Sequence, residues 1–247
     1  MTLLLRLRDD ESGFSLTELL TAMVIGSIVL WALMTLMTTG LNKSIEVTDR
    51  AEAAQNARSA MDRMTTLLDS SMCLDPIASA TAIPPLIGSS TNPTVAGSDG
   101  NYAAFYADLN GVSDQPDKYT LTYDPVADTI TENRFDSSGT LPNITIATTA
   151  STTRVLATNV VPTRDPTNNT QQPIFRYYRF VSSGAINPTP MGTPIAAIDA
   201  ASAVRVVIAF QVVPRRTNKE SRVATTLEGQ SALGTPDPNT PNAGACP

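Results

Sequence analysis

One carboxylate stands alone at the start of a long apolar segment. Glu18 is followed by residues 19–41, a stretch with no charged residue and no proline. An ionised carboxylate at the edge of a lipid-embedded helix costs several kcal/mol unless a cation pairs with it. Cleavage between Gly13 and Phe14 would create a new amino group at Phe14, with Glu18 as the fifth residue. In a staggered helical assembly, the amine of one copy could then neutralise Glu18 of its neighbour in a dry core.

The residues around this glutamate resemble a known processing signal. The sequence GFSLTELL at 13–20, followed by the apolar run, is similar to the class III signal of type IV prepilins and type II secretion pseudopilins. The resemblance implies that a prepilin peptidase cleaves after Gly13 and methylates Phe14, and that Glu18 supports subunit assembly. Two features depart from the family pattern. Three acidic residues outweigh two arginines in the leader, and no proline interrupts the apolar segment.

The residue types argue against catalysis. The chain has no histidine, which removes the commonest general base and the commonest metal ligand. We therefore expect no enzymatic activity, no catalytic residue, no cofactor and no metal site. Asp108 and Asp114 belong to a stretch that vaguely matches an oxygen-ligand calcium loop, but the closing glutamate is missing. A turn is the preferred interpretation, and bound calcium is left open.

Two cysteines, Cys73 and Cys246, are too few for a zinc site and too far apart for a redox CxxC motif. An even pair suits a secreted chain, so we expect one disulfide between them. Such a bond would close a loop of about 170 residues and hold the C-terminal tail near the end of the long helix. Two unpaired thiols are the alternative.

A long helix must position the glutamate. About 20 residues at about 1.5 Å each cross the hydrocarbon of a bilayer, so a transmembrane helix is predicted over 14–41, after a leader over 1–13. Apolar or small residues spaced three and four apart continue as far as Leu68. This spacing predicts an amphipathic stem helix over 42–72.

Beyond residue 73 the composition changes to Thr, Ser, Pro and Gly with short apolar runs, which predicts a β-rich head over 73–230. A flexible proline-rich tail is predicted over 231–247, and the stretch 78–99 is predicted to be poorly ordered. The strands are expected at 119–123, 129–135, 154–159, 174–181 and 203–213. The predicted fold class is α+β, with a long N-terminal helix packed on an antiparallel β-sheet head. This order is similar to the pilin architecture, and the strand succession resembles larger minor pilins and J-type pseudopilins.

These features favour a structural subunit: a minor pilin or pseudopilin of a type IV pilus, or of a related type II secretion or DNA-uptake filament. The resemblance implies four kinds of partner, namely a prepilin peptidase, other pilin or pseudopilin subunits, an inner-membrane assembly platform and the lipid bilayer. It also implies a single-pass protein of the cytoplasmic membrane with its head outside the cytoplasm, later part of a cell-surface or periplasmic filament.

Two alternatives stay open. In the first, the chain is a membrane-anchored adhesin or DNA-binding pilin that acts through its exposed loops. Arg215, Arg216 and Lys219 form a compact basic cluster suited to phosphate, although the net charge of −6 argues against general nucleic-acid binding. In the second, the chain is an anchored exoprotein that is never cleaved, in which replacing Glu18 would change nothing.

Overall fold

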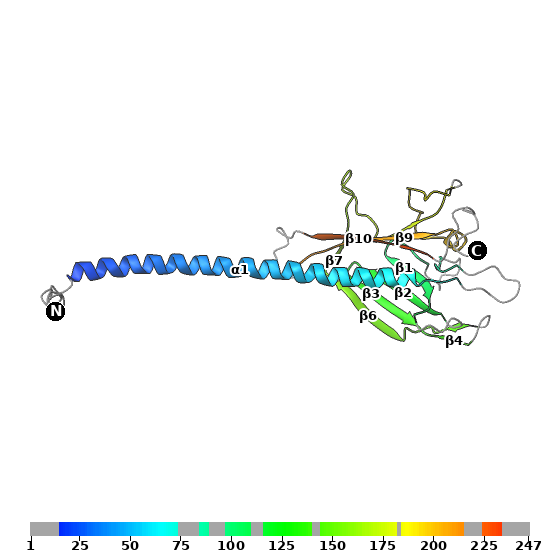
Figure 1. Ribbon diagram of the computed structural model, residues 1–247, viewed down its shortest axis with the longest axis horizontal. Coiled ribbons are helices and arrows are strands. Elements are labelled where there is room, and N and C mark those ends of the chain that lie inside the picture. The colour runs from blue at the N-terminus through cyan, green and yellow to red at the C-terminus, as the bar shows by residue number, and fades with distance from the viewer. Residues whose placement is uncertain are drawn as a thin grey trace, which may run out of the picture. The chain divides into compact units, whose positions relative to one another are not determined.

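The longest element of the computed structural model is helix α1, Leu16–Asp69 (Figure 1). The structure describes residues 15–73, 84–88, 97–109, 116–139, 144–181, 184–214 and 224–233. Threonine hydroxyls in the apolar part of α1 donate back to carbonyl groups of the preceding turn, as Thr35 does to Ala32 at 2.8 Å. These bonds satisfy the hydroxyls without water, so threonine fits in an apolar helix. The predicted long helix is confirmed, and it ends at Asp69 rather than at 72.

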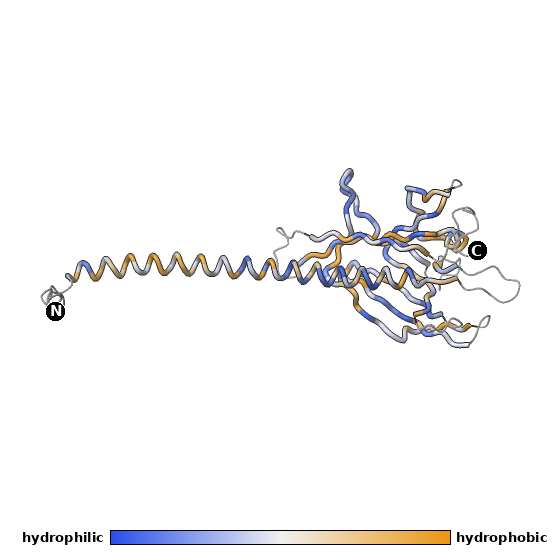
Figure 2. Tube along the Cα trace, in the orientation of Figure 1, coloured by the Kyte–Doolittle hydropathy of each residue, from blue (hydrophilic) through white to orange (hydrophobic). Residues whose placement is uncertain are grey.

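The chain forms two compact units, residues 1–48 and 49–247. In the first unit, α1 carries large exposed apolar side chains, including Ile25, Trp31 and Leu36 at 63%, 75% and 71% exposure. Hydrophobic residues recur along this part of the helix (Figure 2). Among the described residues, α1 is the one helix long and apolar enough to cross a membrane. A helix that is apolar on every side needs lipid or other helices around it.

The second unit is built from antiparallel strands and the C-terminal part of α1. Strand order in the first sheet is β1-β2-β3-β6; in the second it is β10-β9-β7, with β8 also paired to β9, and β4 pairs with β5. The bounds are β1 Tyr102–Ala107, β2 Asp117–Asp124, β3 Thr129–Phe135, β4 Ser137–Ser138, β5 Thr145–Ile146, β6 Thr152–Thr158, β7 Val160–Pro162, β8 Phe175–Tyr178, β9 Arg205–Val212 and β10 Thr225–Ala232, with a short helix α2 at Ala197–Ala200.

The β2–β3 hairpin follows directly from local sequence. Its turn begins at Asp124, whose Oδ1 accepts hydrogen bonds from the backbone N–H groups of Val126 and Ala127 at 2.8 and 3.2 Å. Asp128 completes the turn with a φ of 53°, a conformation that aspartate tolerates better than most residues. The turn sets the register, in which Tyr123 lies opposite Ile130 and Tyr119 opposite Arg134. One face of the hairpin is therefore apolar at its turn end and charged further along.

One face of α1 packs into the core of the head. Met64, Leu67 and Leu68 are fully buried in a cluster that includes side chains of both larger sheets. Strand β10 comes close to the helix at Gly229, where an added Cβ would lie 2.6 Å from the sulfur of Met61. A glycine at this point allows the backbone approach. The predicted apolar stripe is therefore the buried face of α1 from Ala57 onward, whereas Val47 near its start is 66% exposed.

The head differs from the sequence prediction at its margins. β10 runs to Ala232 and Leu233 is buried, so the head extends past the expected boundary at 230; residues 234–247 lie outside the described residues. The prediction of poor order over 78–99 is wrong for residues 84–88 and 97–99. Leu86 is fully buried and bridges Phe105 of β1, and the Ser98 side chain donates to the carbonyl of Ile87 at 2.9 Å. Close hydrogen bonding to β1 outweighs the local Ser/Pro/Gly composition.

Candidate functional site

The predicted processing site lies at the edge of the described chain. Gly13 and Phe14 lie outside the described residues, which begin at Ser15. The carbonyl of Ser15 accepts the backbone N–H groups of Glu18 and Leu19 at 2.9 and 3.1 Å and so starts α1. Glu18 therefore sits in the first helical turn, where a negative charge is favoured by the helix dipole.

Glu18 has an exposed carboxylate that forms no ion pair with any of the described residues. Its neighbours Leu16, Leu19 and Leu20 are 77%, 52% and 56% exposed. Once such a surface enters lipid or a helix bundle, the carboxylate needs a cation from outside its own helix. The Glu18 carboxylate at this end of α1 can therefore form an ion pair with a positive charge on another chain.

The comparisons with known proteins bear on this segment. Residues 8–34 match the family model described as the prokaryotic N-terminal methylation motif. This match fits a type IV pilin-like protein. The motif, the long apolar helix and the antiparallel β-sheet head together have the layout of such proteins. A search of curated proteins finds no significant match.

The motif match covers the residues predicted from the sequence to be processed. It includes Gly13, Phe14 and Glu18, and it continues into the apolar part of α1. In general terms, a pilin-like motif of this kind implies a substrate of prepilin peptidase that assembles with pilin subunits. The apolar helix beside it is consistent with anchoring in a membrane.

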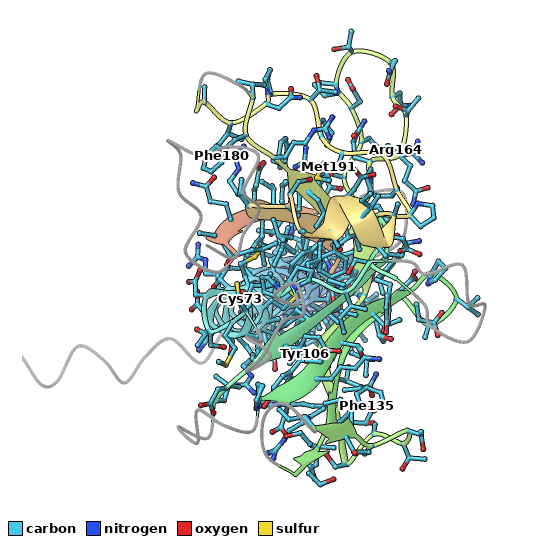
Figure 3. All side chains as sticks on the ribbon, turned by 90° about the vertical axis from the view of Figure 1, so that its right-hand side faces the viewer. Cys73, Tyr106, Phe135, Arg164, Phe180 and Met191 are labelled. Carbon is cyan, nitrogen blue, oxygen red and sulfur yellow. The ribbon has the colours of Figure 1, made fainter. Side chains whose placement is uncertain are left out.

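Cys73 lies just beyond the C-terminal end of α1 (Figure 3). The preceding residue is held beside β1, because the backbone N–H of Met72 donates to the carbonyl of Tyr106 at 3.0 Å. No cysteine among the described residues is a free thiol, while Cys246 lies outside them. The predicted Cys73–Cys246 bond stays a prediction.

Two other predicted features fall largely outside the described residues. Arg215, Arg216 and Lys219 all lie in an undescribed stretch, so the DNA-binding alternative stays a prediction. Of the calcium-like stretch, Asp108 is described and Asp114 is not. Within the ranges that the structure describes, no group of three acidic or cysteine ligands is placed to hold a metal ion.

The head contains a layer of paired charged side chains that the sequence did not predict: Arg63, Asp117, Glu132, Arg134 and Asp136. Arg63 of α1 donates from Nε and from its terminal nitrogen to the two carboxylate oxygens of Glu132 on β3, at 3.1 and 2.8 Å. The hydrogen bond to Glu132 raises the pKa of Arg63. On the same strand, Arg134 lies 2.9 Å from Asp117 and 3.0 Å from Asp136. A bidentate pair fixes geometry as well as energy, so the Arg63–Glu132 pair orients the C-terminal part of α1 on the first sheet.

A signal for this layer was present in the hairpin. Ile130, Glu132 and Arg134 alternate along β3 and therefore point to the same face, which at Ile130 is fully buried. Two charged residues in line with a core isoleucine predict paired partners. The partner on α1, 69 positions earlier, had no such signal.

Proposed function

We propose that the chain is a structural subunit, a minor pilin or pseudopilin of a type IV pilus or of a related type II secretion or DNA-uptake filament. The observation that carries the proposal is the methylation motif at 8–34, joined without a break to a helix whose apolar side chains are exposed. A chain of 247 residues with a large head supports a sparse or terminal position in the filament. Such a head is better tolerated there than in every repeat of a filament wall.

Cleavage after Gly13 would give Glu18 a partner. The new amino group at Phe14 carries a positive charge, and methylation of an amine keeps that charge. In a bundle of staggered helices, this amine on one subunit pairs with Glu18 of the next, and a salt bridge in a dry environment is costly to break. The pair would fix the axial register of neighbouring helices, as buried polar contacts do in coiled coils.

The decisive variant is Glu18→Gln, which removes the charge and keeps the shape of the side chain. We expect the precursor to be processed, the head to stay folded, and incorporation into filaments to fall about tenfold or more, the factor that a loss of about 1.4 kcal/mol produces. The matched control is Glu52→Gln, an exposed glutamate further along α1, which should assemble normally. Equal incorporation of the two variants would contradict the assembly role and favour an anchored exoprotein.

The proposed filament subunit would also carry a Cys73–Cys246 disulfide. Cys73 is not a free thiol, and Cys246 is the second of the chain's two cysteines. The bond would attach the end of the tail beside the C-terminal end of α1. Intact mass before and after reduction tests it: a gain of two hydrogen masses on reduction is expected, and no change would mean that the bond is absent.

A further inference from the structure

A cavity of about 260 Å³ opens beside the Arg63–Glu132 pair in the head. Arg63 of α1 forms one wall, and the remaining polar lining comes from the first sheet: Tyr119, Glu132, Arg134, Thr152 and Arg154. Its volume is slightly below the about 300 Å³ at which pockets for small molecules begin, so it suits a small ligand or a single side chain.

Strand register explains why these side chains meet. Tyr119 of β2 lies opposite Arg134 of β3, which lies opposite Thr152 of β6. The next row on the same face places Glu132 opposite Arg154. Residues directly across antiparallel strands share a face of the sheet. The cavity therefore lies on the face of the sheet that carries the contact to Arg63.

The charges in this cavity are unevenly matched. Arg63 is balanced by Glu132, and Arg134 is balanced by Asp117, with the half-exposed Asp136 as an outer contact. Arg154 is exposed and, within the described ranges, forms no ion pair. The guanidinium of Arg154, which has unused N–H donors, therefore lines the cavity. Each guanidinium carries five N–H groups, so Arg63 and Arg134 can offer further donors there besides those in their ion pairs.

The phenol of Tyr119 adds a neutral donor. Tyr119 is 2% exposed, and burial raises the pKa of its phenol, which therefore stays protonated at neutral pH. Thr152 contributes a second hydroxyl, and Leu109 contributes an apolar wall. The one carboxylate in the lining, Glu132, accepts from Arg63 with both oxygens, so the remaining lining groups are donors next to a short apolar surface. Such a surface matches a carboxylate on an aliphatic stem.

We propose that this cavity binds a carboxylate group on an aliphatic stem, with Arg154 as its ion-pair partner. A singly charged group fits better than a dianion such as phosphate, because one arginine is uncompensated while three carboxylates lie in the same layer. The carboxylate belongs either to a free small acid or to an acidic side chain of another protein. The proposal stands on the head alone and does not depend on the filament function.

The test is calorimetric titration of the full chain in non-ionic detergent at low ionic strength. The probes are acetate, as a free acid, and glutamate blocked at both ends, as a protein side chain; blocked glutamine is the uncharged control. We expect saturable binding of a charged probe and none of blocked glutamine. Blocked glutamate binding clearly tighter than acetate would indicate a protein-borne carboxylate, and similar affinities would indicate a free acid.

Two arginine variants give the matched comparison. Arg154→Ala should weaken binding about tenfold, the loss expected for one charge-assisted hydrogen bond. Arg179→Ala removes another exposed charge, which does not line the cavity, and should leave binding unchanged. Near-ultraviolet circular dichroism checks that both variants are folded. Failure of both charged probes to saturate, or equal losses in the two variants, would overturn the proposal.

Discussion

The bidentate pair between Arg63 and Glu132 joins α1 to the first sheet, and breaking it has a calculable cost. The side chain of Glu132 is 8% exposed and that of Arg63 is 35% exposed. Each charge-assisted hydrogen bond contributes about 1.5–3 kcal/mol when well buried. Because solvent reaches Arg63, we discount this and expect Glu132→Gln to lower the free energy of unfolding of the head by about 1–2 kcal/mol. Arg63→Gln should cost a similar amount.

The assay is urea unfolding of the full chain in detergent, followed by near-ultraviolet circular dichroism of the tyrosines, all six of which lie between residues 102 and 178. The variant with both Arg63→Gln and Glu132→Gln should lose about 1 kcal/mol less unfolding free energy than the two single variants added together, because each single variant already loses the same contact. Thermal midpoints should fall by about 2–4 °C per kcal/mol for a unit of this size.

The matched control is Glu228→Gln. Its partner Arg176 lies 3.6 Å away and Glu228 is 65% exposed, so the change should stay within about 0.5 kcal/mol. A cost for Glu132→Gln no larger than that of Glu228→Gln, or strict additivity of the Arg63 and Glu132 variants, would refute the reasoning.

Two further predictions concern the core of the head. Gly88→Ala should destabilise it by about 1–3 kcal/mol in the urea assay, because the new Cβ would lie 2.6 Å from the backbone of Ala197. Gly192→Ala, which meets nothing within 4 Å, is the control, and equal stability of the two would contradict the packing described here. Burial raises the pKa of Tyr177 well above its ordinary value of 10.0. The stability linked to the Tyr177 proton is therefore complete below about pH 10, where the unfolded state begins to release it, and is lost as the pH rises from there towards the raised pKa of the folded state. We expect Tyr177→Phe to lose less of its circular dichroism signal at alkaline pH than the unchanged chain, and equal alkaline destabilisation of the two would contradict this.

Periodic elements were the ones that the sequence could predict. The three-and-four spacing of apolar residues identified the buried face in the C-terminal part of α1. The strands expected at 119–123 and 129–135 match β2 and β3 to within two residues at each end. In α1 and in this hairpin, the residues that favour the element locally are also the ones that pack in the core.

The missed strands lack such a pattern. In β1, Ala103, Ala104 and Phe105 are consecutive and all fully buried, so there is no alternation between faces. β10 contains Glu228 and Gly229, residues that weaken a strand prediction, and it forms because it pairs with β9 along its whole length. Each pairs with its neighbouring strand along the chain, β1 with β2 and β10 with β9, so strand pairing rather than a periodic pattern decided both.

The candidate sites divide in the same way. Glu18 could be singled out from the sequence because it is a lone charge beside an apolar run, and its spacing from Gly13 has a strict family counterpart. The cavity around Arg154 could not be predicted, since it needs the register of β2, β3 and β6 and the reach of Arg63 from α1.

The central claim is that the chain enters the pilin pathway. Its most direct test is the intact mass and N-terminal fragment sequence of the protein isolated from its native membrane in the presence of prepilin peptidase. The account predicts a chain that begins at methylated Phe14. A chain that retains residues 1–13 under those conditions would contradict it.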